Sequence, residues 1–494
     1  MELKTKILRW SAGVPVAMLN LKTAEKLGVH SKDRIEIRTI GKNPKILSTI
    51  VDTVKGLVKE KEIAVSSELK DILELKNTEK VEVNLSTPPR SLGFIKDKLN
   101  GRILSEEKIR QIVRDVVNNS LSESEIALFI SAVYEHGMNM NETISLTKAI
   151  RDSGRQLRLN HKRQVVDKHS IGGIPGNRTT PLVVSICAAA GLTIPKSSSR
   201  AITSAAGTAD VIETIARVDF TIKEMKKIVK KTNGCMIWGG SLGFVTADDK
   251  MIKVEKMLKI DPEPQLLASI MSKKLAVGSK YIIIDIPYGT GAKVDKKKAL
   301  ALKRKFEYLG RFFKRKLRCV LTDGSQPIGN GIGPVLELLD VIRVLDPKEI
   351  GPRDLEEKSV FLAGNLLEMT GKVKKGHGKA TAQEILDSGK AYKKFKEIIR
   401  AQKGSLKSLS PGKHWKNLGA QRSGRISRID NKEINSLARI AGCPLDRAAG
   451  LYLYIHAGDK VTKGEKILTI YAESAARLKE AIKYYEKTKP IKIM

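Results

Sequence analysis

The chain has 494 residues, 41% of them hydrophobic, enough for about two to four domains with proper cores. No apolar run is long enough to span a membrane, so a membrane protein is excluded at this stage. The formal net charge of +36 comes from lysines and arginines spread over the whole length, and aromatic residues make up only 4%. Few aromatics leave little for base stacking, so we expect small phosphorylated substrates rather than nucleic acid.

The cysteines predict a cytoplasmic protein. Cys187, Cys235, Cys319 and Cys443 are far apart and form no C-x-x-C pair. This spacing is typical of reduced thiols and indicates neither a zinc site nor a disulfide framework. The N-terminal segment MELKTKILRW also lacks the apolar core of a signal peptide. We therefore expect a cytoplasmic location, no metal and no cofactor.

Residues 1–88 predict a separate β-rich domain. Residues 14–19, 34–38 and 80–84 have strand character, and Leu21–Leu27 predicts a short helix ended by Gly28. Residues 87–90, Thr-Pro-Pro-Arg, are typical of a linker. No catalytic arrangement is evident in this region.

A helical domain is predicted over residues 89–160. Ser105 begins one amphipathic helix with two glutamates in its first turn, which suits the helix dipole. Ser122 to Glu125 has the form of a capping box that opens the next helix. Residues 246–276, which are helical with a break at 261–264, are expected to return to this domain.

Residues 165–210 predict a phosphate site. A short strand at 165–166 precedes a glycine-rich loop at 167–177 and an apolar helix at 180–190. A second strand at 192–195 then leads into a hydroxyl-rich loop at 197–208. This layout places backbone N–H groups and a helix N-terminus around an anion. The loop matches neither the Walker A motif nor G-x-G-x-x-G, and the alternative is a surface loop with solvated lysines.

The remaining pattern predicts an α/β domain over residues 161–410 and an α+β domain over 411–494. A helix at 221–231, a strand at 235–238 and a flexible turn at 239–243 follow the phosphate region. The strand at 281–286 ends in a second loop suited to phosphate, and a basic helix at 296–316 comes next. Alternating strands and helices place ligand loops at the carboxyl ends of parallel strands. The predicted fold class is a multidomain α/β protein.

Four motifs carry a resemblance to a known family: DKHSIGG (167–173), SSSRAITSAAGTAD (197–210), IDPEPQLLASIMSKK (260–274) and YGTGAKV (288–294). In this order and spacing the chain resembles the thymidine phosphorylase superfamily, and within it most closely the archaeal-type AMP phosphorylases. The resemblance covers essentially the whole chain, including the N-terminal extension. It implies a helical domain, a large mixed-sheet α/β domain, a C-terminal α+β domain, and a dimer or larger homo-oligomer in which the extension serves assembly.

The implied activity is phosphorolysis of nucleoside 5′-monophosphates, converting AMP and phosphate to adenine and ribose 1,5-bisphosphate in nucleotide salvage. The partners would be AMP or other nucleoside monophosphates and inorganic phosphate, with no membrane or nucleic-acid partner. Asp261 would be the proton donor to the leaving purine, which requires a pKa raised by burial or neighbouring acidity. An aspartate before proline could instead be a helix cap.

The resemblance also assigns binding residues. Phosphate would be bound by Lys168, Ser170, Ser198 and Thr208. His169 is added to the phosphate contacts because it lies in the glycine loop, where a catalytic or orienting role is expected. The nucleotide would be bound by Gly173, Ser199, Arg200, Ala201, Ile202, Thr203, Ser204, Thr208, Ser269, Lys273 and Lys293. Among these, Arg200 and Lys293 are the candidates for the AMP 5′-phosphate. Ser269 and Lys273 could equally form a solvated helix face.

Val254 stands where the pyrimidine enzymes use an arginine on the base, which favours a purine. Two departures concern the AMP enzymes: Ala205 stands where they usually have proline, and Pro181 interrupts the helix after the glycine loop. Three alternatives stay open. They are a thymidine or pyrimidine nucleoside phosphorylase, an enzyme like anthranilate phosphoribosyltransferase, and a basic RNA-binding protein without catalysis.

Overall fold

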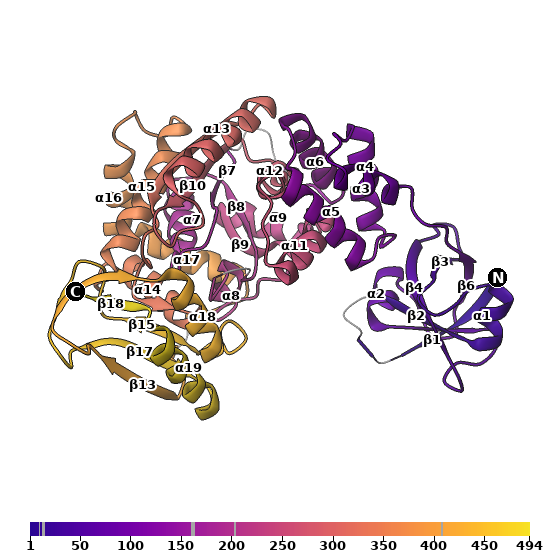
Figure 1. Cartoon of the computed structure of the whole chain (residues 1–494). Helices are drawn as coiled ribbons and strands as arrows, with labels where there is room; N and C mark the ends of the chain where they lie inside the picture. Colours follow the sequence, from indigo (N-terminus) through magenta and orange to yellow (C-terminus); the bar gives the residue numbers. More distant parts are fainter. Residues whose placement is uncertain (9, 12–14, 160–163, 202–203, 407–408) are drawn as a thin grey trace. The chain divides into compact units, whose positions relative to one another are not determined.

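A computed structural model describes residues 1–8, 10–11, 15–159, 164–201, 204–406 and 409–494 (Figure 1). The chain forms two compact units. The first comprises Met1–Ser153 and Thr246–Ser269, and the second Gly154–Val245 and Ile270–Met494. Two of the predicted nucleotide contacts, Ile202 and Thr203, lie outside the described residues.

The N-terminal part of the first unit is a closed six-stranded barrel with the strand order β1-β5-β2-β4-β3-β6. Its strands are β1 (Glu2–Ile7), β2 (Val16–Asn20), β3 (Arg34–Thr39), β4 (Ile46–Val54), β5 (Glu62–Val65) and β6 (Lys80–Leu85), with helices α1 (Leu21–Leu27) and α2 (Ser67–Leu73). Alternating residues such as Ile35 and Ile37 point into its core. Helix α1 ends at Gly28, whose φ is 70°, as predicted.

Helices make up the rest of the first unit. They are α3 (Ser91–Leu99), α4 (Glu106–Val117), α5 (Glu123–His136), α6 (Met140–Asp152), α11 (Thr246–Leu258) and the beginning of α12 (Glu263–Val277). Ser105 caps α4, and Ser122 and Glu125 form the predicted capping box of α5. Helix α11 packs against α4 and α5. Helix α11 belongs to the first unit, whereas α12 passes from the first unit into the second after Ser269.

The second unit is built on parallel strands (Figure 1). They are β7 (Val166–Ser170), β8 (Ile194–Ser198), β9 (Gly234–Trp238), β10 (Tyr281–Tyr288) and β11 (Lys316–Asp323). One sheet has the order β11-β10-β7, a second pairs β8 with β9, and a parallel bridge between Val165 and Thr193 joins the two. Because all these strands run parallel, the loops that follow them meet at one edge, where α/β sheets bind ligands.

Helices cover these strands and form the main core. They are α7 (Thr179–Ala189), α8 (Thr208–Ile212), α9 (Ile222–Thr232), α10 (Gly239–Leu242), α13 (Lys296–Phe312), α14 (Pro334–Leu345), α15 (Arg353–Met369), α16 (Gly378–Asp387) and α17 (Lys390–Ala401). Helix α7 is apolar on all sides and nearly completely buried, since it packs against α15 and α17 as well as the strands.

The C-terminal region belongs to the same unit and has its own core. Its elements are β12 (Gly331–Ile332), β13 (His414–Gly419), β14 (Gly424–Ile429), α18 (Asn431–Ala441), β15 (Gly450–Leu453), β16 (Lys460–Val461), β17 (Lys466–Ala472), α19 (Ala475–Thr488) and β18 (Ile491–Ile493). Strand β12, which precedes α14, joins the sheet β12-β15-β17-β13. The C-terminal core also includes Ala205, from the loop after β8. The expected multidomain α/β fold is confirmed.

Several predicted boundaries were wrong, mainly where polar residues belong to strands. Asp167 to Ser170, predicted as loop, belong to β7, and Ser197 and Ser198 belong to β8. Residues 239–242, predicted as a turn, form the single helical turn α10. The basic helix ends at Phe312, so β11 begins earlier than predicted, at Lys316. Polar residues extend these strands because tertiary partners satisfy them, and local sequence does not show such partners.

Candidate functional site

Lys168 lies on β7, near the carboxyl end of the strand, with a side chain that is only 2% exposed. Its Nζ donates a hydrogen bond to Thr179 Oγ1 at 2.6 Å, at the start of α7. Burial lowers the pKa of Lys168 to about 7, although the nearby charge of Asp285 opposes the shift. The alternative of a solvated surface lysine is therefore wrong, and this cation is held where an anion would meet a helix N-terminus.

A buried charge cluster lies beside it. Asp167 Oδ2 is 2.8 Å from Lys274 Nζ, and Asp167 Oδ1 is 3.5 Å from Lys196 Nζ. Burial alone would raise the pKa of Asp167, but the charges of Lys196 and Lys274 hold it below its ordinary value. Burial lowers the pKa of Lys274 to about 7. We did not predict this cluster, because its members come from β7, β8 and α12 and show no common spacing.

His169 and Ser170 complete the strand end. Burial, followed by the charges of Lys274 and Lys196, lowers the pKa of His169 well below its ordinary value. The imidazole is therefore neutral at pH 7 and can offer a hydrogen bond but no positive charge. Ser170 Oγ accepts a hydrogen bond from Asn177 Nδ2 at 3.3 Å. Their predicted phosphate contacts stay a prediction.

The glycine loop needs its glycines for space and for backbone conformation. Gly172 and Gly173 have φ values of 89° and 94°, which side-chain-bearing residues rarely adopt. At Gly176 an added Cβ would lie 2.1 Å from the carbonyl oxygen of Ile328. The loop leads into α7, and no described side chain caps the N-terminus of this helix. Pro181 lies in the first turn of α7, where proline is tolerated, as expected.

Arg178 contacts predicted site residues, and sequence reasoning did not single it out. Its guanidinium donates to Thr208 Oγ1 at 2.9 Å, to the Ala206 carbonyl at 2.7 Å and to Glu337 at 2.6 Å. It therefore joins the glycine loop to the hydroxyl-rich loop and fixes the predicted phosphate contact Thr208. An arginine just before an apolar helix was the available signal.

The hydroxyl-rich loop places its predicted contacts in different surroundings. Ser198 Oγ donates to the Ile237 carbonyl at 3.4 Å, and Ser204 Oγ donates to the Ala206 carbonyl at 2.7 Å. Ser199 is exposed. The buried Ala201 N–H donates to Asp210 at 2.7 Å, which shapes the loop's first turn.

The guanidinium of Arg200 is paired with carboxylates of the protein in this structure. Its guanidinium pairs with Glu213, with one nitrogen 2.8 Å from Oε1, and lies 3.3 Å from Asp210 Oδ1. The same group lies 4.8 Å from the centre of the Trp238 ring, a cation–π distance. Lys293, the other candidate for the AMP 5′-phosphate, is exposed in the loop after β10. A Cβ on Gly173 would lie 3.5 Å from Lys293 Cβ, so Lys293 borders the glycine loop.

The first unit contains two of the other predicted contacts, Asp261 and Ser269. Asp261 lies between α11 and α12 and is exposed, so the burial that its acid role requires is not provided here. Ser269 is buried, and its Oγ donates to Asp248 Oδ2 at 2.9 Å, which overturns the solvated-face alternative for this serine. Val254, on α11, is buried. Lys273 belongs to the second unit and is half-buried.

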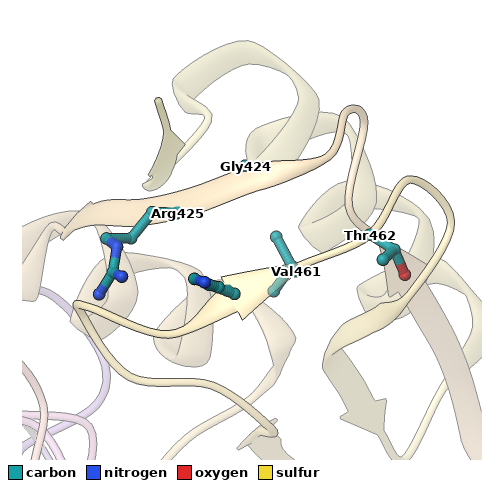
Figure 2. Close-up of a pocket in the computed structure, with 5 residues that line it drawn as sticks. Gly424, Arg425, Val461 and Thr462 are labelled. Carbon is teal, nitrogen blue, oxygen red and sulfur yellow. The ribbon is translucent and has the colours of Figure 1, made fainter.

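A hollow of about 400 Å³ lies elsewhere, at the paired antiparallel strands β14 and β16 (Figure 2). Gly424, Arg425, Val461 and Thr462 line it together with Lys460. It contains none of the predicted contacts. Among the described residues, no group of three or more histidines, cysteines, aspartates or glutamates could hold a metal ion, and no helix is long and apolar enough to cross a membrane.

Comparisons with known proteins agree along the chain. Residues 93–154 match the helical bundle domain of a glycosyl transferase family, and residues 162–392 match its a/b domain. Residues 425–492 match the pyrimidine nucleoside phosphorylase C-terminal domain. A solved structure of anthranilate phosphoribosyltransferase from Thermus thermophilus is similar to 63% of this chain and 99% of its own, with a TM-score of 0.52 and 19% identity. That likeness concerns the fold alone.

Full-length relatives carry the assignment further. The AMP phosphorylase of Pyrococcus furiosus is 43% identical over 99% of this chain and 97% of its own length. That of Thermococcus kodakarensis is 43% identical over 100% of this chain and 98% of its own, and that of Methanococcus aeolicus is 41% identical over 99% and 97%. Alignments at this level of identity that span the chain, the N-terminal barrel included, show that the chain belongs to the AMP phosphorylase family.

Proposed function

We propose that the protein catalyses phosphorolysis of AMP, giving adenine and ribose 1,5-bisphosphate. The observation that carries this proposal is full-length identity above 40% to AMP phosphorylases from several archaea. The geometry around Lys168 supports it, because a buried cation beside an uncapped helix N-terminus suits an anionic nucleophile. The enzyme is a pentosyltransferase.

Inorganic phosphate is the nucleophile in this reaction. Lys168, the α7 N-terminus and the hydroxyls of Ser170, Ser198 and Thr208 would bind it, and Arg178 keeps Thr208 in place. One phosphate oxygen attacks C1′ of the ribose as the C1′–N bond to the purine breaks. Neutral His169 would donate or accept a hydrogen bond at this site, since it offers no charge. Positioning and electrostatics would supply most of the rate gain.

The electron pair of the broken bond goes to the purine, which must take up a proton. Asp261 would supply it, and this needs a pKa near the working pH. Asp261 is exposed in this structure. For Asp261 to serve as the donor, the bound nucleotide would therefore have to cover this carboxyl group.

Two features would select a purine nucleotide. Val254 presents a buried apolar side chain where the resemblance places an arginine in pyrimidine enzymes. Lys293 would contact the AMP 5′-phosphate, because it is exposed and borders the glycine loop. Arg200 would shape the loop through Glu213 and Asp210 and contribute its charge from there. Gly173, Ser199, Ala201, Ser204, Ser269 and Lys273, with Ile202 and Thr203, complete the proposed nucleotide contacts.

We also propose a homo-oligomer in the cytoplasm, with the N-terminal barrel as its assembly domain. The four cysteines support a reducing compartment, because they are buried free thiols and burial raises the pKa of each. Light scattering of the full chain, compared with a variant lacking residues 1–85, tests the oligomer. An unchanged number of subunits would contradict the role of the barrel.

The test of the activity is product analysis. Purified protein is incubated with phosphate and AMP, and in parallel with thymidine and with adenosine, and the products are resolved by chromatography. Adenine and ribose 1,5-bisphosphate from AMP alone would support the proposal. Cleavage of thymidine would move the enzyme to nucleosides, and turnover of none of the three would overturn the assignment.

A further inference from the structure

Helix α18 of the C-terminal region presents two asparagines one helical turn apart. Asn431 and Asn435 are at positions i and i+4, so they lie on the same face of the helix. Asn431 is 0% exposed and Asn435 is 7% exposed. An unpaired buried side-chain amide is costly. Both polar atoms of the Asn435 amide are hydrogen-bonded, whereas Asn431 uses its Nδ2 and its buried Oδ1 has no hydrogen-bond partner among the described residues.

Asn435 joins the two loops that carry most of the proposed contacts. Its Oδ1 accepts a hydrogen bond from the Ala205 N–H at 2.9 Å, and its Nδ2 donates to the Gly173 carbonyl at 3.4 Å. Ala205 is completely buried, so water cannot replace this acceptor. Gly173 follows β7, and Ala205 follows β8.

Asn431 does the same for the next two loops. Its Nδ2 donates to the Gly324 carbonyl at 2.8 Å, in the loop after β11, and lies 3.4 Å from the Gly291 carbonyl, in the loop after β10. Lys293 stands two residues beyond Gly291. The two asparagines therefore contact the loops that follow β7, β8, β10 and β11, which are parallel strands.

The helix that carries them is itself firmly held. Asp430 caps α18 by accepting from the backbone N–H groups of Lys432 and Glu433. Ile434, Leu437 and Ala438 are fully buried in the C-terminal core. A short, capped and packed helix is a rigid support for the two amides.

We propose that Asn431 and Asn435 are positioning residues of the nucleotide site, which fix the spacing of its four loops. The C-terminal region then positions the loops of the site. The kinetic consequence rests on the proposed AMP phosphorolysis, whereas the effect on the loops does not. The alternative is that the asparagines only stabilise the docking of the C-terminal region.

The test compares two asparagines whose side-chain hydrogen bonds connect the C-terminal region with the rest of the second unit. Asn435→Ala removes the link between the Gly173 and Ala205 loops. Asn330→Ala, the matched control, removes a 2.8 Å hydrogen bond to the Leu453 carbonyl on β15 and leaves those loop contacts intact. Both full-length variants are assayed for kcat and for the KM of phosphate, and by hydrogen exchange of peptides covering residues 171–178 and 204–207.

We expect Asn435→Ala to raise the KM for phosphate about tenfold and to speed exchange in both peptides. Asn330→Ala should change that KM by less than about twofold and leave both peptides protected. Asn435→Asp keeps the acceptor for Ala205 but loses the donor to Gly173. It should therefore lose protection over 171–178 while keeping it over 204–207, and it serves also if the alanine variant fails to fold.

Equal melting losses in both alanine variants, with unchanged KM and unchanged loop exchange for Asn435→Ala, would overturn the proposal. If the wild type turns over no AMP, the proposed function fails. Hydrogen exchange then decides the positioning role by itself, because faster exchange confined to the two loop peptides supports it and unchanged exchange overturns it.

Discussion

Lys168 and Asp261 are the two groups on which the proposed chemistry depends, and they differ in burial. Lys168 is 2% exposed, and its Nζ donates a hydrogen bond to Thr179. Burial lowers its pKa to about 7. Asp261 is exposed at a helix break. In the proposed mechanism, folding of the second unit prepares the phosphate contact Lys168 in advance, whereas the proposed proton donor Asp261 would be covered only when nucleotide binds. The predictions below test this contrast.

The largest effect is expected at the proton donor. Asp261→Asn removes the proton while keeping the shape, so kcat should fall by about 10²–10⁴-fold with little change in the KM for phosphate. Asp71→Asn, at an exposed aspartate of α2, is the control and should be neutral. Steady-state kinetics of AMP phosphorolysis measure both. A kcat within threefold of the wild type would remove Asp261 from the mechanism.

The second-largest effect is expected at the buried Lys168. Lys168→Met keeps the volume but removes the charge, so kcat/KM should fall by about 10²–10³-fold. Unlike most buried-site changes, it should not lower the free energy of unfolding at pH 7, because a buried charge is costly. Lys226→Met, at an exposed lysine of α9, is the matched control. Substantial destabilisation of Lys168→Met with intact activity would show that Lys168 supports the fold and does not bind phosphate.

The pH dependence of phosphate affinity tests the role of the charge on Lys168. Phosphate needs the charged form of Lys168, whose pKa in the folded protein is about 7, so its contribution to phosphate affinity should fall as pH rises above 7. The loss should approach about tenfold per pH unit relative to Lys168→Met. Isothermal calorimetry on both proteins isolates this difference. Parallel curves for the two would contradict it.

The sign is opposite for stability. Between about pH 7 and the ordinary value of 10.5, the unfolded chain holds the proton that the folded Lys168 has released. The free energy of unfolding contributed by this lysine therefore rises with pH across that window. Urea titrations at pH 7 and pH 9 should show a smaller rise for Lys168→Met than for the wild type.

The smallest effect concerns the Ala205 N–H. Proline at this position has no N–H, so Ala205→Pro should lose the bond to Asn435 and about 1 kcal/mol of stability. Combined with Asn435→Ala, the second change should cost less than it does alone, by a coupling energy of about 1 kcal/mol. Denaturant unfolding of the four proteins measures this cycle. Additive losses would show that the hydrogen bond contributes nothing.

The local sequence predicted elements wherever local rules decide them. The capping box at Ser122, the terminating Gly28 and the buried strand at 281–286 follow from neighbours within a few residues. The same rules misplaced the ends of β7 and β8, since Lys168 and Ser198 are polar and suggest a loop. Their strand conformation depends on pairing with β10 and β9, respectively.

The sequence by itself determined the multidomain α/β class, the AMP phosphorylase family and the identity of most proposed contacts, because ordered motifs carry that information locally. Only the tertiary structure decided which charges are buried and which are paired. Arg200 is held by Glu213 and Asp210, Asp167 is enclosed by Lys196 and Lys274, and Asn435 reaches Ala205 from 230 residues away. Such partners meet only when distant strands and helices pack, and burial then sets their pKa values and hydrogen bonds.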